Sequence, residues 1–173
     1  MSGNITRRRR KTYKKTTCSK QQNAIAVLDM SPIKGKVKFT EIANNRVLVS
    51  YDISGLKDGK HGFHIHQYGD LSDGCTSACA HFNPDNTEHG GPYSEVRHAG
   101  DLGNVEAKNG YAKGQVTVNG ISTDPRSKRS IIGRAIIVHA DPDDLGRGGD
   151  EESKKTGNAG KRIACAVIGF TSI

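Results

Sequence analysis

Short runs in which apolar and polar residues alternate recur along most of the chain. Between residues 46 and 53, every second position is apolar: Val47, Val49, Tyr51 and Ile53. In a β-strand this spacing places these side chains on one face, so the segment predicts a half-buried strand. Similar alternation or β-branched apolar runs predict strands within residues 24–29, 35–42 (with Val37 and Phe39 on one face), 61–68, 103–118, 131–140 and 162–173.

Turn signals separate these runs, and no segment shows the periodicity of a long amphipathic helix. Asn109-Gly110 divides the 103–118 segment and is typical of a β-hairpin. The pattern therefore predicts an all-β fold, an antiparallel sandwich or barrel. Residues 69–100 and 141–161 interrupt the pattern and are rich in Gly, Asp, Asn and Ser. Loops of this length in a compact domain are usually functional or disordered.

Charge divides the chain into two parts. The net charge is +8, and eight basic residues with no acid lie within residues 1–20, so the remaining 18 basic residues balance the 18 acidic ones. We expect residues 1–22 to form a disordered basic tail and residues 23–173 to form one domain. The tail (Arg7–Arg10, Lys11, Lys14 and Lys15) is either a nuclear or polyanion-binding segment, making contact with nucleic acid, or a solubilising extension.

The hydropathy of the sequence bears on two features, a membrane-spanning segment and a secretory signal. No apolar run has the length of a membrane span, and no apolar stretch follows the basic block as in a secretory signal. We expect a soluble, cytoplasmic protein with no membrane partner and with a nuclear fraction if the tail acts as a targeting segment.

The chemistry concentrates in seven histidines, all outside the tail. His64 and His66 are two residues apart, which on a strand directs both imidazoles to one face, and imidazole suits copper or zinc. Taken alone, this spacing also fits a half-exposed strand with polar residues outward. His139 ends the apolar run 135–138, and a lone histidine at a strand end is more often structural than a ligand.

The first long loop carries a second group of candidate ligands. Three imidazoles and one carboxylate form the tetrahedral set that zinc prefers, and these are His81, His89, His98 and Asp101. The alternative is a solvated polar loop with incidental histidines.

The joint order of these motifs resembles one known family. The motifs are His61-Gly62-Phe63-His64-Ile65-His66, Gly74-Cys75-Thr76-Ser77-Ala78, His81-Phe82-Asn83-Pro84, His89-Gly90-Gly91-Pro92, Arg97-His98-Ala99-Gly100-Asp101-Leu102-Gly103-Asn104, Ile131-Ile132-Gly133-Arg134, Val138-His139, Asp144-Leu145-Gly146, Gly157-Asn158-Ala159-Gly160 and Cys165-Ala166-Val167-Ile168-Gly169. Over about residues 23–173 the chain resembles the copper–zinc superoxide dismutases. The resemblance implies a Greek-key sandwich or barrel of about eight strands.

The resemblance also implies two metal sites, each with one ion per subunit. Copper would be held by His64, His66, His81 and His139. Zinc would be held by His81, His89, His98 and Asp101, so His81 would bridge the two metals. The implied reaction converts superoxide into dioxygen and hydrogen peroxide through alternate reduction and oxidation of copper, which protects against oxidative stress.

Further roles follow from matching motif positions. The resemblance makes His81 and Arg162 the catalytic residues, with Arg162 binding the substrate anion. Asp143 would bridge a copper ligand and a zinc ligand, and His61 would be structural. Lys155 and Thr156 match channel positions, where Glu151 and Glu152 would shape the local field.

The four cysteines have sparse, uneven spacing, and an intracellular chain usually keeps them reduced. The resemblance nevertheless implies a disulfide between Cys75 and Cys165, leaving Cys18 and Cys79 as free thiols. Ile163 stands where family members that depend on a copper chaperone have proline, so we expect that a chaperone is not required.

The resemblance implies a homodimer. Two other functions remain alternatives: a non-enzymatic, dismutase-like copper chaperone or docking module, and a zinc-stabilised nucleic-acid binder. The first needs a separate Cys-rich metal-delivery motif, which the sequence lacks, and the second fits poorly with a body of zero net charge.

Overall fold

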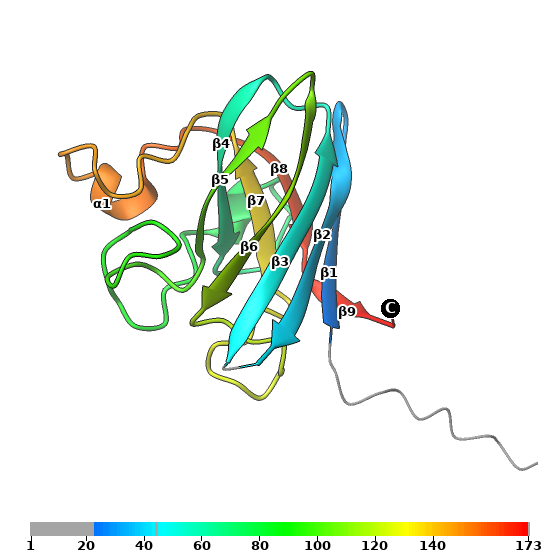
Figure 1. Cartoon of the computed structure of the whole chain (residues 1–173), viewed down its shortest axis with the longest axis vertical. Helices are drawn as coiled ribbons and strands as arrows, with labels where there is room; N and C mark the ends of the chain where they lie inside the picture. The colour runs from blue at the N-terminus through cyan, green and yellow to red at the C-terminus, as the bar shows by residue number, and fades with distance from the viewer. Residues whose placement is uncertain (1–22, 44, 173) are drawn as a thin grey trace, which may run out of the picture.

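The computed structural model describes residues 23–43 and 45–172, so the predicted tail and Cys18 lie outside the described residues. Two antiparallel sheets face each other (Figure 1). The five-stranded sheet has the order β6 (Tyr111–Asn119), β3 (Arg46–Ser54), β2 (Ile33–Ile42), β1 (Asn23–Met30) and β9 (Gly169–Thr171). The four-stranded sheet has the order β5 (Asp101–Ala107), β4 (Gly59–His66), β7 (Ala135–His139) and β8 (Arg162–Val167). The prediction of an all-β sandwich is confirmed.

Alternation along the strands builds the core between the sheets. On β3, Val47, Val49 and Ile53 are at most 1% exposed, and on β2 Val37 and Phe39 are fully buried. The intervening residues of β2 are lysines that face outward. Burial of these alternate side chains sets the register, because a one-residue slip would turn every apolar side chain toward solvent.

The turn predicted at Asn109-Gly110 joins β5 to β6, which lie in different sheets and are paired only by the bridge between Lys108 and Tyr111. Asn109 and Gly110 both have positive φ, 54° and 76°, as a type I′ turn requires. Strands β4, β5 and β6 are consecutive in the sequence. Strand β3, which precedes them in the sequence, pairs with the last of them, β6. This return of the fourth strand is the Greek-key arrangement that the resemblance implied.

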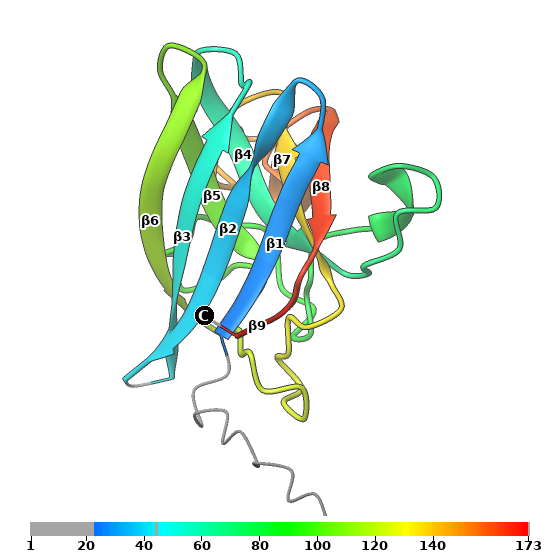
Figure 2. The same cartoon turned by 90° about the vertical axis from the view of Figure 1, so that its right-hand side faces the viewer.

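Two predicted strands end differently in the structure. The 131–140 run becomes a strand only at Ala135, because Gly133 has a φ of 78°. The 162–173 run divides at Ile168, whose amide donates to Arg134 O while its carbonyl accepts from Gly133 N. The chain then leaves the four-stranded sheet, and β9 pairs with β1 (Figure 2). The described residues therefore hold nine strands rather than about eight.

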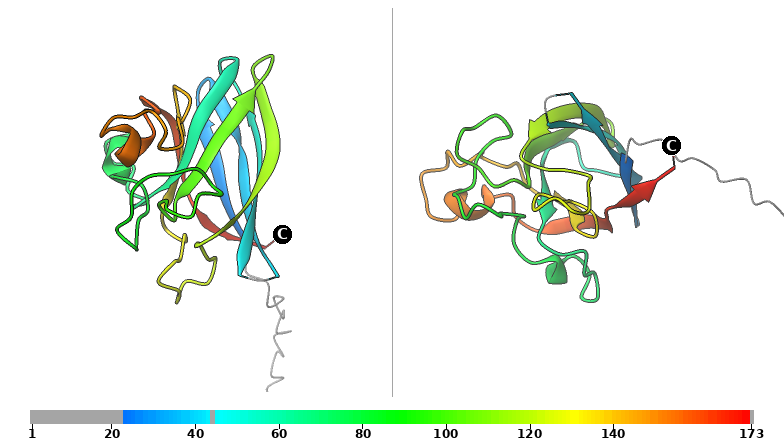
Figure 3. Two further views of the ribbon diagram at one scale, coloured as in Figure 1. Left: turned by 60° about the vertical axis from the view of Figure 1, so that its left-hand side comes forward. Right: turned by 90° about the horizontal axis from the view of Figure 1, so that it is seen from below.

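Both predicted long loops lie on the side of the four-stranded sheet (Figure 3). The first contains a short 3-10 turn, Thr76–Ala78, and the second contains the four-residue helix α1 (Ser153–Thr156). None of the helices in the described part of the chain is long and apolar enough to cross a membrane. The loops cover the outer face of β4, whose last six residues are all buried.

Candidate metal centre

Strand β4 directs two imidazoles away from the core. Phe63 and Ile65 pack into the main apolar core, and His64 and His66, which alternate with them, are 0% and 1% exposed beneath the loops. The prediction that both imidazoles share one face holds because β4 pairs regularly with β7 from Phe63 to His66, although its pairing with β5 shifts register between Gly62 and His64. Because β4 is buried on both faces, its last four residues, 63–66, include no polar residue type other than histidine.

Two further histidines come to this face from distant parts of the chain. His81 forms an isolated antiparallel bridge with His66, and the following amide, Phe82 N, donates to Ile65 O at 2.8 Å. His139 ends β7, which pairs with β4. One ligand atom from each of four buried side chains therefore lies within 4.8 Å of the others, and the four are His64, His66, His81 and His139.

Hydrogen bonds orient each of these rings. Nδ1 of His66 lies 2.7 Å from Cys79 O, and Nδ1 of His139 lies 3.0 Å from Gly160 O. Each of these rings donates through Nδ1 to its carbonyl, which leaves Nε2 as a lone-pair donor, and the two Nε2 atoms are 3.4 Å apart. His64 has the opposite orientation: its Nε2 lies 2.8 Å from the carboxylate of Asp143, which leaves Nδ1 for a metal.

The second group closes around one carboxylate oxygen. Oδ1 of Asp101 lies 2.9, 3.0 and 3.2 Å from Nδ1 of His81, His89 and His98 respectively. Nδ1 of His81 and Nδ1 of His98 are 3.3 Å apart. A tetrahedral zinc site with bonds of about 2.0 Å has ligand atoms about 3.3 Å apart. The spacing of these four side chains therefore fits zinc.

Buried nitrogens without hydrogen-bond partners support the same conclusion. Among the described side chains, His64 Nδ1, His81 Nε2 and His89 Nδ1 are buried and have no hydrogen bond. Nδ1 of His89 is close to Asp101, but not in the geometry of a hydrogen bond. A buried polar atom left unsatisfied costs about 1–3 kcal/mol. The orphaned nitrogens fit metal ligation, and His81 offers one nitrogen to each group.

Asp143 joins the two groups. Its carboxylate oxygens lie 2.8 Å from His64 Nε2 and 2.8 Å from His89 Nε2. Asn104 holds the Asp143 backbone through two hydrogen bonds, of 2.8 and 2.9 Å. Gly157 packs so closely that a Cβ there would lie 2.0 Å from Asp143 Oδ1. Asp143 thus links a ring of the first group to a ring of the second.

Burial and the carboxylates tune the imidazoles in opposite directions. Burial lowers the pKa of His139 to about 4, and burial with the neighbouring rings of His81 and His139 holds the pKa of His64 well below its usual value. These rings are therefore neutral and can act as ligands at neutral pH. Burial alone would lower the pKa of His89, but the nearby negative charges of Asp101 and Asp143, together with the hydrogen bond to Asp143, raise it to about 9. Binding of a metal at His89 therefore displaces a proton.

An arginine stands beside the first group. Arg162, the first residue of β8, is opposite His139 in the β7–β8 pairing. Its Nη1 donates to the carbonyls of Cys75 and Thr76 at 2.8 and 3.0 Å, and its Nη2 donates to Cys79 O at 2.6 Å. These bonds anchor a half-buried guanidinium at a cleft of about 840 Å³. His66, His81 and His139 line the same cleft, as do Lys155 and Thr156 of α1.

The match to known proteins is extensive. The sequence model described as copper/zinc superoxide dismutase (SODC) matches residues 33–168. The chain belongs to the copper/zinc superoxide dismutase family. It is 62% identical over 154 residues to superoxide dismutase [Cu-Zn] of Paramecium bursaria Chlorella virus 1, which covers 88% of this chain and 80% of that protein. It is 53% identical to superoxide dismutase [Cu-Zn] A of Xenopus laevis, covering 85% of this chain and 97% of the relative.

A solved structure extends the comparison to the fold. The crystal structure of the clock protein EA4 matches with a TM-score of 0.83 and 42% identity, covering 92% of this chain and all of that one. Membership of the copper/zinc superoxide dismutase family makes the chain an oxidoreductase that acts on superoxide, and implies copper and zinc. This favours the enzyme over the two non-enzymatic alternatives.

The disulfide expected from this family is present. Cys75 and Cys165 are bonded across a sequence separation of 90 residues, and Cys79 is a free, exposed cysteine. The bond ties the first loop to β8. His61 has the structural place expected for it, with Nδ1 2.8 Å from His139 O and Nε2 2.7 Å from Lys57 O.

Cys79 occupies a backbone conformation that suits glycine. Its φ of 65° and ψ of −149° lie in a region used almost only by glycine, which costs other residues about 1–3 kcal/mol. We expect Cys79→Gly to raise the free energy of unfolding by about 1 kcal/mol, measured by denaturant titration. Cys79→Ala, which removes the thiol and keeps the β-carbon, should give no such gain. An equal gain in both variants would assign the effect to the thiol.

Some residues at this dismutase site were missed in the sequence. Asn104 was noticed only as part of a motif, and its contact with Asp143 spans 39 positions. Lys154 was not singled out, yet its Nζ lies 3.7 and 3.9 Å from carboxylate oxygens of Glu151 and Glu88 at the cleft. In a loop that contains several charged residues, nothing in the local sequence distinguishes a lysine that lines the cleft from one that only faces solvent.

Proposed function

We propose that this chain dismutes superoxide at copper held by His64, His66, His81 and His139, beside zinc held by His81, His89, His98 and Asp101, with one ion of each per subunit. The single observation that supports this most directly is the pair of buried ligand groups that meet at His81. Copper bound there would supply one-electron redox chemistry, and zinc, which has none, would supply a fixed positive charge.

The protein's own groups supply attraction and protons. The Arg162 guanidinium, fixed by three carbonyls, attracts the superoxide anion and positions it. Nε2 of His81 has no hydrogen-bond partner; it would hold a proton only while it does not ligate copper, and in that condition we place proton transfer to the reduced substrate at this atom. Asp143 keeps the rings of His64 and His89 in their orientations during turnover.

Metal loading of the purified chain tests the proposal. Apoprotein given copper and zinc should bind one equivalent of each by metal analysis and consume superoxide, while zinc-only protein should be inactive. Activity in a copper-free preparation would contradict the assignment.

Arg162 allows a sharper prediction for substrate binding. We expect Arg162→Met to lower kcat/KM for superoxide by about 10–100-fold, since a hydrogen bond to a charged group contributes about 1.5–3 kcal/mol. The rate of the variant should also depend less on ionic strength. Arg162→Lys keeps the charge and should recover part of the loss; a loss equal to that of Arg162→Met would show that charge attraction is not the role.

We also propose a homodimer formed by an apolar patch. The patch consists of Val27, Met30, Tyr68, Val167 and Phe170, which are 38–54% exposed. Contacts of neighbouring residues link the segments that carry these side chains: Met30 Sδ is 3.4 Å from Cys165 N, a Cβ at Gly69 would lie 3.2 Å from Val167 Cγ1, and Phe170 pairs with Ala24 on β1. Exposed apolar side chains on linked segments can pair with the same surface of a second copy about a two-fold axis.

Sedimentation tests the dimer. Val167→Glu should shift the protein to monomer, whereas Tyr93→Glu, at a residue that is 80% exposed and outside the patch, should not. A wild-type monomer at micromolar concentration would contradict the proposal.

We propose a cytoplasmic location, with the basic tail directing a fraction to the nucleus or to polyanions such as nucleic acid. The support is the concentration of eight basic residues within residues 1–20. Deletion of residues 1–20 should abolish the nuclear fraction and retention on nucleic acid. An unchanged distribution would contradict the targeting role.

Ile163 supports maturation without a copper chaperone. Copper-free, inactive protein from chaperone-deleted cells would contradict that part.

A further inference from the structure

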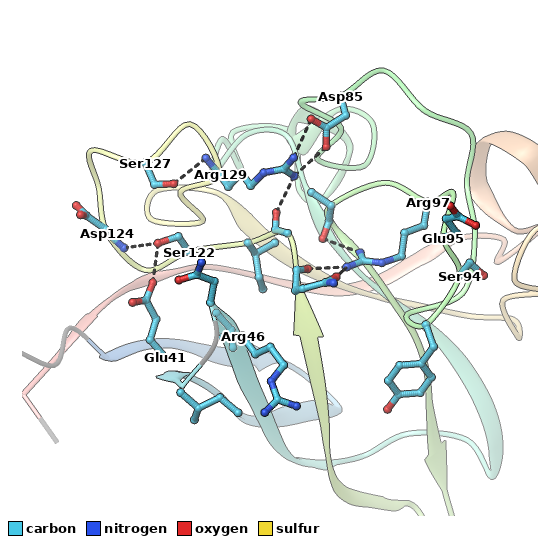
Figure 4. Close-up of a pocket in the computed structure, with 18 residues that line it drawn as sticks. Glu41, Arg46, Asp85, Ser94, Glu95, Arg97, Ser122, Asp124, Ser127 and Arg129 are labelled. Carbon is cyan, nitrogen blue, oxygen red and sulfur yellow. Dashed lines mark hydrogen bonds and ion pairs between the residues drawn. The ribbon is translucent and has the colours of Figure 1, made fainter.

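Arg97 is a nearly buried cation beside a proposed zinc ligand. It precedes His98 directly, and only 9% of its surface is exposed. Its guanidinium lines a cavity of about 1070 Å³ together with Arg129 (Figure 4). Arg129 has an ion pair with Asp85 at 2.8 Å, whereas no ion pair of Arg97 is found among the described residues. Burying a charge is costly unless it is well hydrogen-bonded, so its contacts indicate its role.

The guanidinium of Arg97 joins two distant parts of the backbone. Nη1 donates to the carbonyls of His98 and Ala99 at 2.7 and 3.3 Å. Nη2 donates to the carbonyl and the side-chain oxygen of Asn119 at 2.5 and 2.9 Å. Asn119 is the last residue of β6, at the edge of the five-stranded sheet. One rigid group thus ties the ligand-bearing loop to the opposite sheet.

The tied segment also carries the ligand geometry. The His98 amide donates to Asp101 Oδ2 at 2.8 Å, and His98 Nδ1 lies 3.2 Å from Asp101 Oδ1. The backbone of Arg97 is held from the other side by Thr87 Oγ1, which donates to its carbonyl at 2.7 Å. A shift of the 98–99 backbone would therefore move the imidazole of His98 relative to the other three ligands.

We propose that Arg97 is a positioning residue for zinc, which fixes the carbonyls of His98 and Ala99 against Asn119 so that His98 stays at ligand distance. This inference rests on the proposed assignment of His98 to zinc. Residues that orient metal ligands typically contribute 10–100-fold to metal affinity. The planar guanidinium suits the role because its donors have fixed directions, which the single ammonium of lysine lacks.

The sign of the effect separates positioning from simple electrostatics. A cation close to the zinc site repels the metal, so removal of the charge alone would tighten zinc binding. Loss of a positioning contact would weaken it.

The test uses full-length protein loaded with copper and with zinc, or with Co²⁺ as a coloured probe of the zinc site. Arg97→Met should raise the zinc dissociation constant, measured by chelator competition, by about 10–100-fold and change the visible Co²⁺ spectrum. Arg97→Lys should fall between wild type and Arg97→Met. Arg129→Met, in the same cavity but without contact to His98, should leave both measurements at their wild-type values.

Several outcomes would overturn the inference: zinc affinity in Arg97→Met that is unchanged or tighter, or an equal loss in Arg129→Met. Should Arg97→Met fail to fold, Asn119→Ala decides. It removes one acceptor and should weaken zinc binding in the same direction by a smaller factor, and an unchanged affinity would refute the tether. Wild-type protein that binds no zinc at all would instead refute the proposed metal assignment.

Discussion

His139→Ala is expected to abolish superoxide consumption, with a loss of more than about 100-fold, while zinc stays bound. A single group that only orients a ligand already costs about 10–100-fold when removed, and His139 is itself one of four ligands in the copper group. Its Nε2 also lies 3.4 Å from that of His66, so its removal leaves that group with three ligands. Activity and metal content are measured on the same preparation.

A reciprocal variant is the control for His139→Ala. His98→Ala removes a ligand from the zinc group alone and should release zinc while copper is retained. Loss of zinc with retention of copper in His139→Ala would show that the two metals are assigned to the wrong groups. Full activity in His139→Ala would show that the reaction takes place elsewhere.

Cys75→Ser is expected to lower the free energy of unfolding of the metal-free protein by about 4–5 kcal/mol. The bond to Cys165 closes a loop with a sequence separation of 90 residues, and constraining a loop of this size in the unfolded chain stabilises the folded state by about that amount. The carbonyl of Cys75 also accepts a hydrogen bond from Arg162, so loosening of the loop should reduce kcat/KM as well.

Denaturant titration under non-reducing conditions measures this effect. The free energy of unfolding of wild type whose disulfide has been reduced should match that of Cys75→Ser. Cys79→Ser should keep the full contribution of the disulfide because Cys79 is unbonded. Equal stability of oxidised wild type and Cys75→Ser would show that the loop is already constrained by other contacts.

Local patterns were sufficient for most of the strands. The alternation of Val47, Val49 and Ile53, and the dipeptide Asn109-Gly110, depend only on side-chain direction and backbone φ, so neighbouring residues specify them. The division at Ile168 escaped prediction because it depends on hydrogen bonds to Gly133 and Arg134, far away in sequence.

For the metal centre, the sequence by itself determined the set of ligand types: seven histidines outside the tail, with His64 and His66 on one face of a strand. It also supplied the family motifs through which distant ligands could be grouped. Only the tertiary structure decided which nitrogen of each ring is free, since the carbonyls of Cys79 and Gly160 and the carboxylate of Asp143 take up the other one. It alone placed Asn104 behind Asp143 and Arg97 between His98 and Asn119. The physical reason is that these orienting contacts are made by polar side chains with no periodicity, so they exist only once β-sheet pairing has brought distant segments together.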